Sequence, residues 1–242
     1  MRSALCSALA LLLLLVASSP ASTGEVETLV QEALQEIGAE VVDCAETEVP
    51  YARERICARF SPTLYAFRTQ WNDWMDEAAP ASGAESVDDW TMDWGSCNHR
   101  DYVVGDGAFR VTLDFRARQA NVIYRESPSP TVDIEPAVLE QTEPRFPKAA
   151  KKEKIPGRVA VQVRVDPVGG VKDAELVWAC PQGYGLEAAA VEAVRDWKFE
   201  PAMQGGQAVE ASTVVMVDFR LKIKGRQKSR EVAATQIPVM ID

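Results

Sequence analysis

The 242-residue sequence lacks three features that would assign it to a common class of protein. It has no uninterrupted apolar run of the ~20 residues that a membrane-spanning helix needs. It has no excess of positive charge: 36 acidic residues outnumber 26 basic ones, and a net charge of -10 argues against binding nucleic acid through its phosphates. It has neither paired zinc-ligand motifs nor a D-x-D-x-D-G calcium loop, so we predict no metal site and no cofactor.

The composition that is present is that of a folded chain. Hydrophobic residues make up 47% and charged residues 26%, which suits one or two globular domains. The charge is unevenly distributed, because acidic residues predominate in residues 1–125 and basic residues predominate in residues 144–230. We therefore expect an acidic front half and a basic back half.

The N-terminus has the pattern of a secretory signal peptide. Arg2 is followed by a small and apolar run over Ala4–Ala17 and then by small residues. Ser19 and Ala21 fit the -3 and -1 positions of a cleavage site, which makes residues 1–21 the signal peptide and Ser22 the first mature residue. The alternative is an uncleaved anchor.

An exported protein can form disulfides, and Cys6 leaves with the signal peptide. The remaining cysteines are Cys44, Cys57, Cys97 and Cys180. The first three lie in the front half, where we expect one bridge; Cys44 and Cys57 are candidates if their segments form a hairpin. Cys97 and His99 can also be interpreted as metal ligands or as a nucleophile with its base, but a bridged cysteine is the favoured interpretation.

Residues 22–126 predict a small acidic α+β domain of no recognised family. Helical spacing of apolar residues predicts helices over Val26–Ile37 and, with Ser61 as N-cap, over Pro62–Glu77. Residues 78–89 are expected to be a loop. Extended segments are expected at Val41–Ala45, Arg55–Phe60, Tyr102–Val104, Ala108–Phe115 and Ala120–Tyr124, although a helical turn from Pro50 is an alternative for the second.

The front half also contains a cluster of tryptophans. Trp71, Trp74, Trp90 and Trp94 are expected to be core rather than a ligand-stacking surface.

Residues 127–143 contain several prolines and few apolar residues. This composition predicts a semi-rigid extended linker between the two halves.

The back half has clearer patterns. Alternating valines predict a strand over Val159–Val165, the turn Asp166–Gly170 follows, and Val171–Trp178 returns as a second strand. Apolar residues at helical spacing predict a helix over Leu186–Trp197, and alternation predicts a third strand over Val215–Ile223. The expected order is ββαβ, with one helix packed on the sheet.

The back half contains an ordered set of sequence blocks: Pro144-Arg145-Phe146-Pro147 with Ala149 and Ala150, Gly157-Arg158-Val159, Asp166-Pro167-Val168-Gly169-Gly170-Val171, Ala189-Ala190-Val191-Glu192-Ala193-Val194, Trp197-Lys198-Phe199-Glu200-Pro201-Ala202 and Gly206-Gln207-Ala208-Val209. Through these blocks, residues 144–221 resemble the C-terminal domain of the TonB family, the periplasmic energy-transducing proteins of Gram-negative bacteria. We assign residues 144–224 to this domain and residues 225–242 to a tail.

The resemblance implies a non-catalytic module in the periplasm. Such a module binds an extended peptide of an envelope protein, such as an outer-membrane receptor, as a strand added beside its last strand. The residues that the resemblance places at the partner are Pro144, Arg145, Phe146, Pro147, Val214, Met216, Asp218, Arg220, Lys222 and Lys224.

The chain departs from the family pattern because its apolar run and its linker are both short. We therefore expect an exported adaptor that binds protein and is neither an enzyme nor a nucleic-acid binder, with membrane contact only if the signal segment is uncleaved. One alternative is an anchored, inner-membrane TonB-like energy transducer for outer-membrane transport. Another is an enzyme in the front domain that uses Cys97 and His99.

Basic residues occupy every second position from Arg220 to Arg230. In an extended chain these side chains project from one face. They are interpreted either as charges that prevent edge-to-edge aggregation or as a row that meets an acidic strand.

Overall fold

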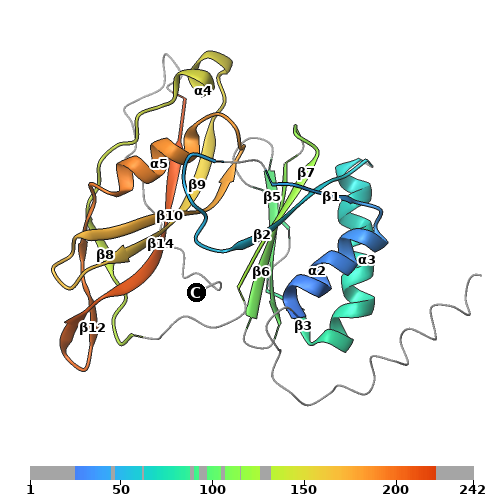
Figure 1. Cartoon of the computed structure of the whole chain (residues 1–242), viewed down its shortest axis with the longest axis horizontal. Helices are drawn as coiled ribbons and strands as arrows, with labels where there is room; N and C mark the ends of the chain where they lie inside the picture. The colour runs from blue at the N-terminus through green and yellow to red at the C-terminus, as the bar shows by residue number, and fades with distance from the viewer. Residues whose placement is uncertain are drawn as a thin grey trace, which may run out of the picture.

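The computed structural model of the chain describes residues 25–44, 47–61, 63–87, 90–92, 97–104, 107–114, 116–125 and 132–221. These residues form two small α+β domains side by side (Figure 1), which confirms the fold class expected from the sequence. The expected signal peptide and the basic positions from Lys222 onward lie outside the described residues.

Helix α2 (Glu25–Glu36) is the amphipathic helix expected at the start of the front domain. Its apolar residues, including Val26, Val30 and Leu34, are buried because helical spacing brings them to one face. The helix is followed by Gly38, whose φ of 71° is in the left-handed region that favours glycine.

Helix α3 (Leu64–Ser82) differs from the sequence prediction at both ends. Thr63 rather than Ser61 caps its first turn, since Thr63 Oγ1 accepts a hydrogen bond from the Ala66 amide at 3.3 Å. The helix also continues beyond Glu77 through residues that were expected to be a loop. Alanines in this stretch favour helix and Pro80 disfavours it, so local propensity alone does not account for the extension.

The front sheet is antiparallel, with the order β1-β2-β7-β6-β5-β3 and with β4 also paired to β5. Its strands are β1 (Glu40–Val42), β2 (Glu54–Arg59), β3 (Ala84–Ser86), β4 (Thr91–Met92), β5 (Cys97–Val104), β6 (Gly107–Asp114) and β7 (Gln119–Arg125). The expected bridge within the front half joins Cys44, just after β1, to Cys57 on β2.

Helices α2 and α3 pack on one face of this sheet and form the front core. Trp71 of α3 is fully buried there, and its Nε1 donates to the Tyr102 hydroxyl at 2.9 Å. Burial raises the pKa of Tyr102 to about 12, so this hydroxyl stays protonated. Trp71 is therefore core, as expected.

The back domain has a three-stranded antiparallel sheet with the order β10-β9-β14. Strands β9 (Gly157–Val165) and β10 (Val171–Cys180) form a hairpin, helix α5 (Leu186–Val194) follows, and β14 (Ala211–Phe219) completes the ββαβ order. The last strand begins and ends earlier than the expected Val215–Ile223. It ends at Phe219, which pairs with Gly157, the first residue of β9; among the described residues the pairing goes no further.

Smaller elements are inserted around this unit. They are β8 (Ala137–Glu140), which pairs with β11 (Lys198–Glu200), the hairpin of β12 (Ala202–Gln204) and β13 (Gln207–Val209), and the short helix α4 (Lys148–Glu153). Strand β8 falls within the sequence expected to be a linker. Val138 packs on the back core and supplies the apolar contact that anchors this strand.

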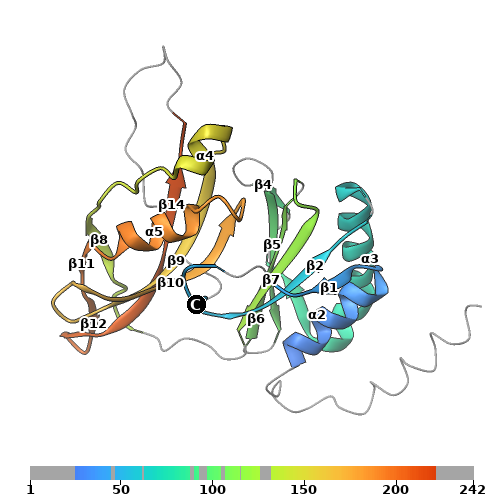
Figure 2. The same cartoon turned by 45° about the horizontal axis from the view of Figure 1, so that its top comes forward.

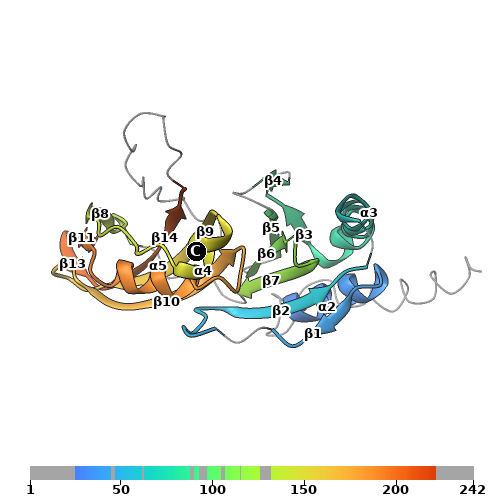
Figure 3. The same ribbon diagram turned by 90° about the horizontal axis from the view of Figure 1, so that it is seen from above.

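The elements form four layers: α2 and α3, the front sheet, the back sheet and α5 (Figures 1 and 3). Strand β6 is buried along its whole length because it lies between two layers. Its odd-numbered residues face the helices, and its even-numbered residues face the back domain, where Arg110 contacts Trp178. The back sheet likewise contacts α5 on one face, while a separate apolar cluster on its other face includes front-domain residues.

Candidate functional site: the outer edge of β14

Strand β14 forms one edge of the back sheet. Among the described residues it pairs only with β9, so its other side carries a row of backbone N–H and C=O groups with no strand partner. Such an edge is a template for an added strand.

The residues that direct their backbone outward from β14 follow from the hairpin geometry. The Asp166 amide donates to the Gly170 carbonyl at 2.9 Å, so even-numbered residues of β9 direct their backbone groups to β10 and odd-numbered ones to β14. Val163 lies opposite Thr213, which makes the odd-numbered residues of β14 its inward ones. The outward groups belong to Ser212, Val214, Met216 and Asp218.

The opposite edge of the sheet is closed by the chain itself. Tyr51 forms a parallel bridge with Leu176 of β10. The Ala52 amide donates to the Leu176 carbonyl at 2.8 Å, and the Leu176 amide donates to the Pro50 carbonyl at 2.9 Å. A three-residue segment, Pro50–Ala52, therefore acts as a short added strand from the front domain. The helical turn considered for this segment is not formed.

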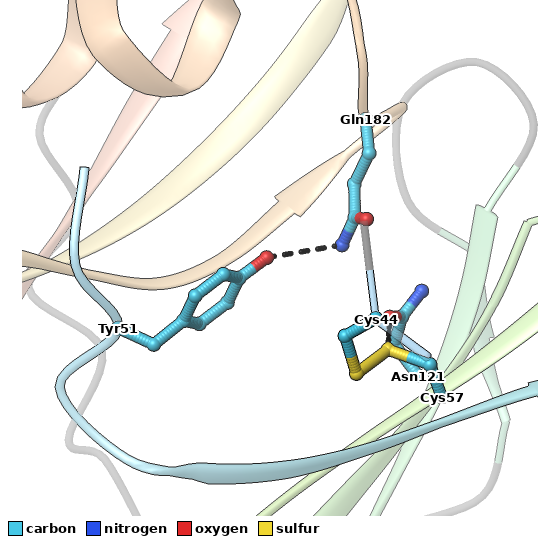
Figure 4. Close-up of a disulfide and its surroundings, with 5 residues drawn as sticks. All are labelled: Cys44, Tyr51, Cys57, Asn121 and Gln182. Atoms are coloured by element: carbon cyan, nitrogen blue, oxygen red, sulfur yellow. Dashed lines mark hydrogen bonds between the residues drawn. A yellow bond between two sulfur atoms is a disulfide. The ribbon is translucent and has the colours of Figure 1, made fainter. Parts of the chain in front are cut away.

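Side chains hold this segment in position (Figure 4). The Gln182 amide donates to the Tyr51 hydroxyl at 3.3 Å, and the Arg55 guanidinium carbon lies 3.7 Å from the Tyr51 ring centroid. Burial raises the pKa of Tyr51, although Arg55 acts in the opposite direction. The Cys44–Cys57 disulfide lies at the base of the same loop and limits its movement.

A second apolar cluster lies on the face of the back sheet opposite α5. Trp178, Ala160 and Met216 occupy one row across β10, β9 and β14, and this cluster also contains Cys97 and Ile123 of the front domain. Val214 and Met216 belong to it, and as whole residues they are only 5% and 4% exposed.

The front domain contributes a buried ion pair near this cluster. Arg110 of β6 makes two hydrogen bonds to the Asp101 carboxylate, at 2.6 and 2.7 Å. The Arg110 guanidinium carbon also lies 5.6 Å from the Trp178 ring centroid. Because both charges are paired, the arginine can lie between the sheets without an isolated buried charge.

A disulfide joins Cys97 of the front domain to Cys180 at the end of β10, with the two Cα atoms 6.3 Å apart. The sequence pointed to a bridge within the front half and left Cys180 undecided. Asp114 has a carboxylate oxygen within 4.8 Å of the cysteine sulfurs, but both sulfurs are consumed by the bridge. Bridged Cys97 is not a nucleophile for the enzyme considered from the sequence.

Asp218 is held by arginines at the end of the edge strand. Its carboxylate accepts hydrogen bonds from Arg158 at 2.6 Å and from Arg220 at 2.8 Å. Burial opposes ionisation, but the two arginines outweigh it and lower the pKa of Asp218. Asp218 and Arg220 are thus engaged with each other in the described structure.

The segment Pro144–Pro147 lies beside the same end of β14. Phe146 and Phe219 make an edge-to-face contact with ring centroids 5.8 Å apart, and Arg145 is exposed. The structure thus brings Pro144–Pro147 and the end of β14 together from distant parts of the sequence. Lys222 and Lys224 lie outside the described residues.

The sequence analysis missed two contributors to this edge. Tyr51 closes the β10 side, and Arg158 pairs with Asp218 across the strands. Arg158 stands at the start of an alternating strand, but the identity of its partner depends on the register between strands 60 positions apart. Tyr51 belongs to a segment too short to show periodicity.

Comparison with known proteins identifies the back domain. Residues 142–221 match the family described as the Gram-negative bacterial TonB protein C-terminal, and these residues are therefore a TonB C-terminal domain. The match begins after the front domain ends.

Two relatives are called Protein TonB. The one from Vibrio cholerae serotype O1 is 30% identical over 91 residues, covering 38% of this chain and 37% of the relative. The one from Salmonella typhimurium strain LT2 is 30% identical over 113 residues, covering 47% of this chain and 44% of the relative. The chain thus spans less than half the length of these relatives.

A solved structure, the solution NMR structure of the Pseudomonas aeruginosa TonB CTD, is 28% identical to the matching part of this chain. It covers 39% of this chain and 93% of its own, with a TM-score of 0.30. Within the described part of the chain, no helix combines the length and apolar character needed to cross a membrane.

Proposed function

We propose that this protein is exported to the periplasm and captures an extended segment of an envelope protein as a strand added to the outer edge of β14. The carrying observation is the asymmetry of the back sheet. Its β10 edge pairs with the chain's own Pro50–Ala52, whereas the outer side of β14 has no strand partner among the described residues.

Capture by strand addition needs only backbone groups along β14, with nearby side chains supplying selectivity. The backbone groups are the outward ones of Ser212, Val214, Met216 and Asp218. The side chains that supply selectivity are those of Arg220 and of Pro144–Pro147, which lie at one end of the same strand. The front domain in this proposal closes the competing edge and directs partners to β14.

A proline substitution separates backbone capture from side-chain capture. Ser212 is exposed and its amide faces outward, so Ser212→Pro removes a donor to the added strand and leaves the β9 pairing in place. Ser212→Ala is the matched control. The probe is a seven-residue peptide selected from a random display library on residues 22–242.

We expect Ser212→Pro to weaken binding of the selected peptide by about tenfold, the effect of about one lost hydrogen bond, and Ser212→Ala to leave it unchanged. Isothermal titration calorimetry measures both. Equal affinity for Ser212→Pro and the parent chain, with both variants folded by circular dichroism, would reject the edge as the binding site.

The second candidate function is that of an anchored energy transducer. It is favoured by the similarity to proteins called TonB. N-terminal sequencing of the exported protein separates the two candidates, because a chain that begins at Ser22 has lost the segment needed for anchoring.

A further inference from the structure

Exposed cations gather at one end of the back domain. The sequence has no lysine before Lys148, and a cluster of basic residues then begins close to that position. We define the cationic end as Arg145, Lys148, Lys151, Lys152 and Lys154, all of which are exposed.

The geometry of helix α4 directs three of these lysines away from the protein. Lys148, Lys151 and Lys152 are spaced i, i+3 and i+4, which brings them to one face. Ala150, on the opposite face, is fully buried against the back core. The lysine face is therefore turned away from the back core and toward solvent.

Residues 145–154, which span the cationic end, contain one acidic residue, Glu153, against five basic residues. Some other exposed cations of the domain are paired: Arg164 contacts Asp173 at 2.8 Å and Lys172 contacts Glu210 at 2.7 Å. Arg195 and Lys198 are exposed, form no ion pair within the described residues and are separate from this cluster in sequence. Within the described residues, no ion pair involves a member of the cationic end. Lys151 and Lys152 interact favourably with the dipole at the C-terminus of α4. This interaction does not explain why Arg145 and Lys148 are also basic.

The C-terminal end of β14 lies at the same end of the domain as the cationic end. Phe146, just before α4, contacts Phe219 at the end of β14. Figure 2 shows α4 beside this end of β14. Arg220 follows β14, and the sequence then continues with basic residues and no acidic residue before Glu231: Lys222, Lys224, Arg226, Lys228 and Arg230.

The far side of the molecule has the opposite charge. Helix α2 has no basic residue and exposes Glu32 and Glu36, and helix α3 exposes Asp73, Asp76 and Glu77. These helices form the outer layer on the side away from α4 (Figures 1 and 2). The charge of the protein is therefore polarised, with a basic end at α4 and an acidic face at α2 and α3, although the net charge is -10.

We propose that the cationic end docks on the surface of a bilayer that contains anionic phospholipids. Lysines on an outward helix face can contact several lipid phosphates of a flat membrane surface at once. A single peptide strand would contact few of these lysines. Each Lys or Arg near an anionic surface contributes about a factor of five to binding, and the effect is screened by salt. Docking would hold the C-terminal end of β14 toward the membrane.

The test is co-sedimentation of residues 22–242 with two kinds of vesicle: phosphatidylethanolamine with phosphatidylglycerol, and phosphatidylcholine alone. The variant is Lys148→Gln/Lys151→Gln/Lys152→Gln. The control, Arg116→Gln/Arg195→Gln/Lys198→Gln, removes the same amount of charge from exposed positions elsewhere. Circular dichroism is used to check that both variants are folded.

We expect binding to the phosphatidylglycerol vesicles that disappears in high salt, falls about tenfold or more in the lysine variant and falls less than about twofold in the control. Equal binding to both kinds of vesicle, or equal losses in both triple variants, would overturn the proposal. The assay contains no peptide, so its failure would leave capture at the β14 edge standing.

Discussion

At the scale of single residues, Asp218 stabilises the end of the edge strand. Its carboxylate is 4% exposed and bonded to Arg158 of the neighbouring strand. Removing one partner of such a pair leaves the other with an uncompensated charge. Arg158 and Arg220 thus depend on Asp218 for their positions beside the proposed partner.

We predict that Asp218→Asn lowers the free energy of unfolding by about 1–3 kcal/mol at pH 7. The folded pKa of Asp218 is lowered, so its contribution is present above the unfolded pKa and is lost as the pH falls through the folded pKa. Urea titrations at pH 7 and below pH 3 should show the difference shrinking in acid. A constant difference at both pH values would contradict the assignment.

Single residues were predictable from the sequence when their role was local. Buried valines of β9 and the core position of Trp71 follow from periodicity alone. The pairing of Arg158 with Asp218 does not, because nothing in either local sequence specifies a partner 60 positions away.

At the scale of elements, the two edges of the back sheet differ in what they pair with. Strand β10 is covered by Pro50–Ala52, and β14 is left for a partner in our proposal. Covering an edge with the chain's own backbone is one way in which proteins prevent unwanted pairing.

Replacing Ala52 with proline should uncover the β10 edge. The substitution removes the amide that donates to the Leu176 carbonyl at 2.8 Å. We expect amide exchange at Leu176 to accelerate by at least about tenfold, because its own bond to the Pro50 carbonyl weakens as well.

Ala52→Gly is the control, since it keeps the amide and removes only a methyl group. Hydrogen exchange followed by NMR reports both variants. An unchanged Leu176 rate in Ala52→Pro would show that the segment does not close this edge.

Sequence patterns predicted α2, α3, α5 and the long strands of both sheets, but they did not predict the short helix α4. They were wrong where tertiary pairing decides the boundary of a strand. Alternation continues through Leu221 and Ile223, yet β14 ends at Phe219 because β9 begins at Gly157. Strand β8 was missed because four residues between prolines do not show a period, and only its pairing with β11 makes it a strand.

At the scale of the whole molecule, a covalent bond and an apolar cluster join the two domains. The Cys97–Cys180 disulfide connects β5 to the end of β10, beside Trp178. The cysteine count allowed this pairing, but only the register of both sheets brings these cysteines together.

A protease site inserted after Arg125 tests this connection. We expect the cleaved chain to remain one band on a non-reducing gel and to separate into two fragments after reduction, because the bridge joins residues on opposite sides of the cut. The Cys180→Ser variant should separate without reductant. Two fragments from the cleaved parent chain without reductant would contradict the pairing.

Hydrogen exchange along β14 tests the central proposal most directly. In the free protein, amides of Ser212, Val214, Met216 and Asp218 should exchange faster than those of Thr213, Val215 and Val217, which face β9. A library-selected peptide should slow the even-numbered amides and leave the odd-numbered ones unchanged. Peptide binding that leaves the even-numbered amides unprotected would contradict capture at this edge.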